Sequence, residues 1–117
     1  MNATQKDRML HIIVRGAGSQ ECWYSFDDDG RDTRSVLGDL LKADDPEEFD
    51  KVVDKGFCDD DLFTIATKRI GVLGTLKKAY GLTYEQLLAL EKVGSAHEKL
   101  SDRRLALLHV VSNWPTA

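Results

Sequence analysis

The chain has 117 residues, a length typical of one domain, and 42% of them are hydrophobic while 31% are charged. This composition provides enough apolar surface for a core and excludes an intrinsically disordered chain. The apolar runs are too short for a membrane-spanning helix of about 20 residues, and the polar N-terminus lacks a signal-peptide core, so we expect one cytoplasmic domain over residues 1–117.

The first predicted element is a strand over residues 9–15, which are rich in β-branched side chains with apolar residues in alternation. Residues 16–20 contain two glycines that tolerate a positive φ, and a second β-favouring segment follows over residues 21–26. Turn-forming residues at 28–30 end this segment. The pattern predicts a β-hairpin with a five-residue loop.

Two short helices are predicted after the hairpin. The first has Asp32 or Thr33 as its N-cap and carries apolar residues at helical spacing. The second has Asp45 as its N-cap and Pro46 at its first position, and it ends before Gly56.

The longest predicted helix follows the aspartates at 59–61, which suit the positive end of a helix, and it ends at Gly81. Residues 63–67 also favour a strand, and Gly71 and Gly74 either break this helix or allow another helix to cross closely. We keep a continuous helix as the prediction.

Two further helices complete the pattern. Thr83 begins a capping-box sequence for the first of them, which Gly94 ends. The last helix begins at Ser95 or Ser101 and continues to about Asn113. The whole sequence therefore predicts an α+β fold, with an N-terminal two-stranded antiparallel β-hairpin packed on a bundle of about five helices.

Residues suited to catalysis or metal binding form no recognisable motif. The candidate nucleophiles, bases and ligands are spread over different predicted elements: His11, His97, His109, Cys22 and Cys58. The glycines at 16–18 lack the third glycine and following helix of a phosphate-binding loop, and residues 27–30 lack both end ligands of a calcium loop. We predict no catalytic residue, no metal and no cofactor, and two reduced thiols, while an uncharacterised enzyme stays a third hypothesis.

The stretch from Leu76 to Leu87 resembles the first two helices of a helix-turn-helix repressor domain. The resemblance covers a dozen residues and implies a DNA-binding transcriptional regulator. It departs from that family because residues 92–99 contain Gly94 and provide no basic recognition helix. The basic side chains that would contact phosphates in this alternative are Lys68, Arg69, Lys77, Lys78, Arg103 and Arg104.

The net charge of −4 conceals an uneven distribution of charge. Residues 27–61 contain 14 acidic and five basic side chains, whereas residues 62–117 contain eight basic and four acidic ones. Carboxylates gathered on a folded surface repel one another, which suggests a basic partner, although ordinary solubility explains them equally well.

The leading hypothesis is therefore a small non-catalytic regulatory or inhibitory protein that binds a protein partner, such as a basic nucleic-acid-binding protein. Nucleic acid is the second choice of partner, no membrane contact is expected, and the sequence does not indicate an oligomeric state. The predicted contact residues are Trp23, Asp27, Asp28, Asp29, Asp44, Asp45, Glu47, Glu48, Asp59, Asp60 and Asp61.

Overall fold

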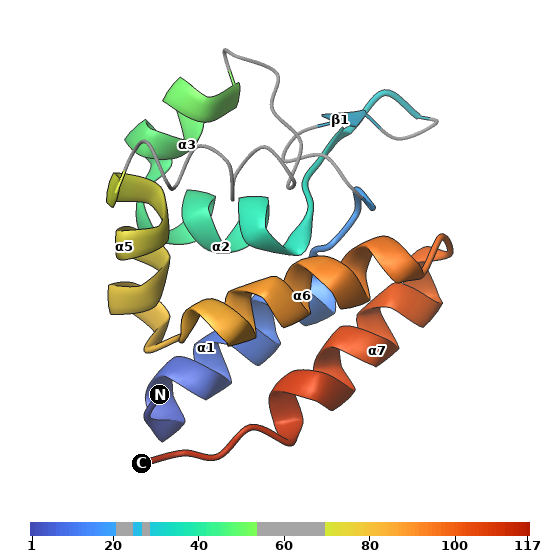
Figure 1. Ribbon diagram of the computed structural model, residues 1–117. Coiled ribbons are helices and arrows are strands. Elements are labelled where there is room, and N and C mark those ends of the chain that lie inside the picture. The colour runs from blue at the N-terminus through green and yellow to red at the C-terminus, as the bar shows by residue number, and fades with distance from the viewer. Residues whose placement is uncertain (21–24, 27–28, 54–69) are drawn as a thin grey trace.

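The computed structural model describes residues 1–20, 25–26, 29–53 and 70–117 (Figure 1). These residues form six helices and one short pair of strands. In chain order the elements are α1 (Ala3–Arg15), β1 (Ser25–Phe26), β2 (Asp32–Thr33), α2 (Val36–Asp44), α3 (Pro46–Val53), α5 (Ile70–Tyr80), α6 (Tyr84–Ala96) and α7 (Leu100–Ser112). The predicted α+β class is wrong, because the described part of the chain is mostly helical and each of its strands is two residues long.

Helix α1 occupies the place of the predicted first strand. A capping box begins it: the Asn2 side chain accepts a hydrogen bond from the Gln5 N–H at 2.8 Å, and the Gln5 side chain accepts one from the Asn2 N–H at 2.9 Å. Met9 and Ile13, one helical turn apart, are fully buried, whereas Val14 is half exposed. The cap and the packing of the buried face outweigh the β-propensity of this short run.

The observed strand pairing lies later in the chain than predicted. β1 and β2 are antiparallel, with Ser25 opposite Thr33 and Phe26 opposite Asp32. The chain therefore reverses between residues 26 and 32, where Gly30 has a φ of +77°. Of the turn predicted at 28–30, Asp29 and Gly30 are described, and they lie between the two observed strands and not after a hairpin closed at 16–20.

The two short helices that follow lie close to their predicted positions. The N-cap of α2 is Ser35, whose hydroxyl accepts a hydrogen bond from the Gly38 N–H at 3.2 Å, so the prediction of Asp32 or Thr33 as the cap is wrong. Asp45 caps α3 as predicted, since its Oδ1 accepts a hydrogen bond from the Glu48 N–H at 3.1 Å.

Helix α5 is continuous from Ile70 to Tyr80 and passes through both of its glycines. Gly81, with a φ of +63°, follows its last residue, and this predicted helix end is confirmed. Among the described residues, no atom lies within 4 Å of a Cβ added at Gly74, so none of the described helices crosses closely at this glycine. The predicted beginning of this helix, including residues 59–61 and 63–67, lies outside the described residues.

The boundaries of α6 and α7 are partly as predicted. The capping box of Thr83 is present, with the Gln86 side chain accepting the Thr83 N–H at 2.9 Å. The prediction that Gly94 ends this helix is wrong, because α6 continues to Ala96. Helix α7 ends at Ser112 with Asn113 as its C-cap, which confirms the predicted end.

The core lies where α2 meets the other helices. Figure 1 shows α2 in the middle of the molecule, and it packs against α1, α3, α5 and α6, while α7 packs against α1 and α6. Tyr80 is fully buried here, and its hydroxyl donates a hydrogen bond to the Leu40 carbonyl at 2.7 Å. Burial raises the pKa of Tyr80 to about 12. This tyrosine joins α5 to α2 at the centre of the fold.

Candidate functional site

Several of the residues predicted to make contacts lie outside the described residues. These are Trp23, Asp27, Asp28, Asp59, Asp60, Asp61, Lys68 and Arg69, together with Cys22 and Cys58. Of the remainder, Asp29 is exposed beside the turn between β1 and β2. The others lie on α2, α3, α5 and α7 or in the turn between α2 and α3.

The largest group of described carboxylates lies where α2 ends and α3 begins. Five acidic residues fall within seven consecutive positions, and we call them the acidic surface: Asp44, Asp45, Glu47, Glu48 and Asp50. Pro46 follows the turn between the two helices and begins α3, which lies beside α2 at the upper left of Figure 1. Asp50 was missed by the sequence-based prediction, although it follows Glu47 at helical spacing.

Members of the acidic surface differ in their partners. Asp44 Oδ1 lies 3.6 Å from Arg8 Nη1, and Glu48 Oε2 lies 4.0 Å from Lys51 Nζ. Asp45 caps α3. Glu47 and Asp50 are exposed and form no ion pair within the described ranges of the chain. Two carboxylates therefore remain available for contact with another molecule.

Two of the basic residues predicted to contact nucleic acid bind the protein's own backbone. Arg103 is only 4% exposed; its Nε donates to the Ala17 carbonyl at 2.7 Å, and its Nη1 donates to the carbonyls of His97 and Glu98 at 2.9 Å each. Arg104 donates from Nε to the Gly16 carbonyl at 2.7 Å. Burial, with the nearby Arg104 charge as a second cause, lowers the pKa of Arg103.

The basic residues of α5 also have neighbours of their own. The Lys77 ammonium lies 5.9 Å from the centre of the Tyr84 ring. Lys78 shares a hollow of about 420 Å³ with Asp44 and Asp45. Among the described residues, the predicted phosphate contacts therefore do not form one uniformly basic surface.

The helices that resemble a helix-turn-helix domain are present, but no basic recognition helix accompanies them. Residues 81–83 join α5 to α6. Helix α6 carries Glu85 and Glu91 against a single lysine, Lys92. Since α7 directs Arg103 and Arg104 inward, neither helix presents the basic face that a major-groove contact requires.

Four charged side chains hold the loop after α1, and we call them the loop cluster: Arg34, Asp39, Arg103 and Arg104. Asp39 is 8% exposed; its Oδ2 accepts a hydrogen bond from the Ala17 N–H at 2.6 Å, and its Oδ1 accepts one from Arg34 Nε at 2.9 Å. Burial raises the pKa of Asp39, although both partners act in the opposite direction. The sequence signal that could have found this cluster is the Gly-Ala-Gly loop, which the strand pattern assigns to a hairpin.

The conformation of the loop after α1 restricts which residues can stand at positions 16 and 17. A Cβ added at Gly16 would collide with the Asp39 carboxylate, and Ala17 has a φ of +58°, which is uncommon for a residue with a side chain. Ala17 is fully buried and belongs to the core. The loop cluster therefore stabilises a strained turn between α1 and β1.

A hollow of about 260 Å³ opens beside the loop cluster, between α1 and α2. Three basic side chains line it, Arg15 from α1, Lys42 from α2 and Arg34 from the segment before α2. Asp39 is its one acidic member. We call this feature the basic hollow; the sequence-based prediction did not include it, because its residues lie far apart along the chain.

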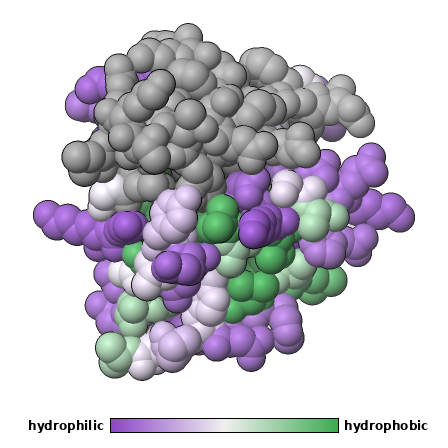
Figure 2. All heavy atoms as spheres, in the orientation of Figure 1, coloured by the Kyte–Doolittle hydropathy of each residue, from purple (hydrophilic) through white to green (hydrophobic). Residues whose placement is uncertain are grey.

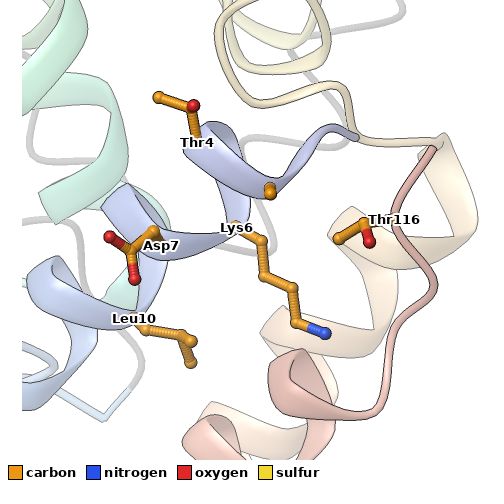
Figure 3. A pocket seen from close by; sticks show the side chains of 6 residues that line it. Thr4, Lys6, Asp7, Leu10 and Thr116 are labelled. Atoms are coloured by element: carbon orange, nitrogen blue, oxygen red, sulfur yellow. The ribbon is translucent and has the colours of Figure 1, made fainter.

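A larger hollow, of about 530 Å³, lies between α1 and the C-terminal segment (Figure 3). Figure 3 shows the Lys6 side chain extending from α1 toward that segment. Its ammonium donates hydrogen bonds to the carbonyls of Ser112 and Trp114, at 2.7 and 2.8 Å. Lys6 thus fixes the end of the chain, and Trp114 packs against the core.

Apolar side chains are exposed on α1 and α7. Val14 and Leu108 help to line a hollow of about 350 Å³ between these helices, and Leu105, one turn before Leu108, is 68% exposed. Figure 2 shows further apolar side chains lying among hydrophilic ones over α6 and α7. Scattered apolar residues of this kind are normal on a protein surface.

The three histidines belong to different parts of the fold. His11 lies on α1, His97 follows α6 and His109 lies on α7 beside Asn113. In the described ranges, no three acidic, histidine or cysteine side chains are placed to hold a metal ion. No helix there is both long enough and apolar enough to cross a bilayer.

The sequence matches no family model, and no curated protein or solved structure is significantly similar to it. The function must therefore be argued from the chemistry of this chain's own surface.

Proposed function

We propose that this protein is a non-catalytic regulatory or inhibitory protein that binds a basic protein partner through the acidic surface. The observation that carries the proposal is the presence of Glu47 and Asp50, exposed and without an ion pair among the described residues, within a run of five carboxylates. Mutual repulsion makes such a run mildly unfavourable in the free protein. A basic partner would relieve this repulsion and be attracted over a distance.

The orientation of the basic side chains favours a protein partner over nucleic acid. A protein that binds DNA requires several lysines or arginines directed outward along one face. Arg103 and Arg104 donate instead to backbone carbonyls, and Lys78 lies near Asp44 and Asp45. The class of partner that fits best is a basic nucleic-acid-binding protein. We also propose that the protein is cytoplasmic.

The test compares binding by the wild type with that of the double variant Glu47→Gln/Asp50→Asn. The defined probe is a lysine-rich peptide, followed by fluorescence anisotropy at two salt concentrations, and the native partner is sought by quantitative affinity purification from the host. Exposed charge pairs contribute up to about 1 kcal/mol each, so we expect roughly fivefold to tenfold weaker binding by the variant and weaker binding at high salt.

The matched control is Glu85→Gln/Glu98→Gln, which removes two exposed carboxylates from another part of the chain. The proposal requires this control to bind the probe as the wild type does. Equal weakening by both double variants would show a non-specific charge effect and contradict the acidic surface as the site. Tight DNA binding by the wild type, with no protein recovered from the host, would favour the transcriptional regulator instead.

A further inference from the structure

The basic hollow gathers three cationic side chains that come from separate parts of the chain. Arg15 ends α1, Arg34 precedes α2, and Lys42 lies in the last turn of α2. Among the described residues, neither Arg15 nor Lys42 forms an ion pair. Three like charges around a hollow of about 260 Å³ repel one another, and an anion placed among them would relieve that repulsion.

The one carboxylate in the hollow, Asp39, is already satisfied by the protein. Its two oxygens accept hydrogen bonds from the Ala17 N–H and from Arg34 Nε. It therefore holds the Arg34 guanidinium by its Nε and leaves the Nη1 and Nη2 groups without a hydrogen-bond partner in the described ranges of the chain. The outer edge of a guanidinium, formed by Nη1 and Nη2, can donate two parallel hydrogen bonds to an oxyanion.

A single aromatic ring positions two of the cations. Arg34 lies 5.9 Å and Lys42 lies 5.3 Å from the centre of the Phe49 ring, which is itself only 2% exposed. Because the ring is fixed in the core, both side chains are held near one place before any ligand arrives. Such preorganisation reduces the entropy lost on binding.

We propose that the basic hollow is a binding site for the phosphate group of a small molecule. Arg34 would contact the phosphate oxygens in a bidentate manner, while Arg15 and Lys42 would contribute charge and further hydrogen bonds. The hollow is slightly smaller than a typical ligand pocket, which suits a phosphate with a small body and not a nucleic-acid strand. This site is separate from the acidic surface and does not depend on the function proposed above.

The test is an NMR titration of the full chain with inorganic phosphate and with pyrophosphate. We expect saturable changes in amide shifts centred on residues 15–16, 34 and 42. A charge-assisted hydrogen bond contributes about 1.5 kcal/mol or more, so Arg15→Gln and Lys42→Gln are each expected to weaken pyrophosphate binding about tenfold. Neither side chain belongs to the hydrogen bonds that hold the loop after α1.

Lys92→Gln is the matched control, because Lys92 is an exposed lysine on α6, away from the hollow. It should leave the pyrophosphate affinity within twofold of the wild type. Thermal unfolding of all three variants verifies that each is folded. The absence of saturable shifts in the wild type would overturn the proposal, as would equal weakening by Lys42→Gln and Lys92→Gln or shifts centred on α5 and α6.

Discussion

The charged side chains of the loop cluster and those of the acidic surface differ in their surroundings. In the loop cluster, Asp39 and Arg103 are almost inaccessible, and their polar atoms bind backbone groups of Ala17, His97 and Glu98. On the acidic surface, Glu47 and Asp50 face solvent. Charges of the first kind hold the chain in its fold, while charges of the second kind are available to other molecules.

This difference shows why a count of charges along the sequence does not reveal their roles. Arg103 and Arg104 contribute to the basic second half of the chain, and Asp39 contributes to its acidic middle. All three nevertheless stabilise one loop. The uneven charge of the sequence is therefore only partly a surface property.

The largest effect is expected from Asp39→Ala, which removes the acceptor of the Ala17 N–H and the partner of Arg34. Because alanine removes the acceptor of both hydrogen bonds from a nearly buried site, we expect a loss of about 3 kcal/mol of unfolding free energy, measurable by urea denaturation. Asp39→Asn is the matched variant; it keeps one oxygen for the Ala17 N–H, and we expect a loss of only about 1 kcal/mol. Equal losses in the two variants would mean that the carboxylate charge, not the hydrogen bond, stabilises the loop.

An intermediate effect is expected from Arg103→Gln. The variant leaves the carbonyls of Ala17, His97 and Glu98 without their common donor, so we expect a loss of about 2 kcal/mol in urea denaturation. Arg104→Gln removes one such hydrogen bond, to Gly16, and should cost about 1 kcal/mol. The reverse order would show that Arg104, not Arg103, is the main support of the loop.

The helices predicted correctly were those whose ends carry their own chemical signal. Asp45, Thr83 and Gly81 determine helix boundaries through local hydrogen bonds or a positive φ, and such signals can be read from neighbouring residues. The predicted N-terminal strand failed for a related reason. The strand prediction considers the short β-branched run alone, without the capping box of Asn2 and Gln5 that begins the helix containing this run.

The candidate sites, like the helix ends, were predictable only where neighbouring residues form them. The acidic surface is a run of neighbouring residues, so the sequence predicted four of its five members. The basic hollow and the loop cluster depend on contacts between α1, α2 and α7, and residues such as Arg34 and Arg103 are 69 positions apart. No local pattern indicates that such residues meet, because only the packing of the helices brings them together.

A change of pH is expected to have a smaller effect on the unfolding free energy, and the sign of this effect follows from the pKa of Asp39. Burial raises the pKa of Asp39 in the folded protein above its ordinary value of 3.8, so the folded state holds this proton more tightly than the unfolded state. The resulting stabilisation is complete below pH 3.8 and is lost as the pH rises through the folded pKa. The difference in unfolding free energy between the wild type and Asp39→Asn should therefore decrease over this range. A difference that increases with pH would show that Arg34 and the Ala17 N–H outweigh burial.

The smallest effect on stability is expected on the acidic surface. Glu47→Gln/Asp50→Asn should change the unfolding free energy by less than about 0.5 kcal/mol, because neither side chain is buried or paired among the described residues. Removing two repelling charges offsets the loss of a favourable charge, Glu47, in the first turn of α3. Urea denaturation at low and high salt measures the balance. A loss as large as that of Arg103→Gln would place these carboxylates with the loop cluster, as supports of the fold, and would remove the reason for treating them as a contact surface.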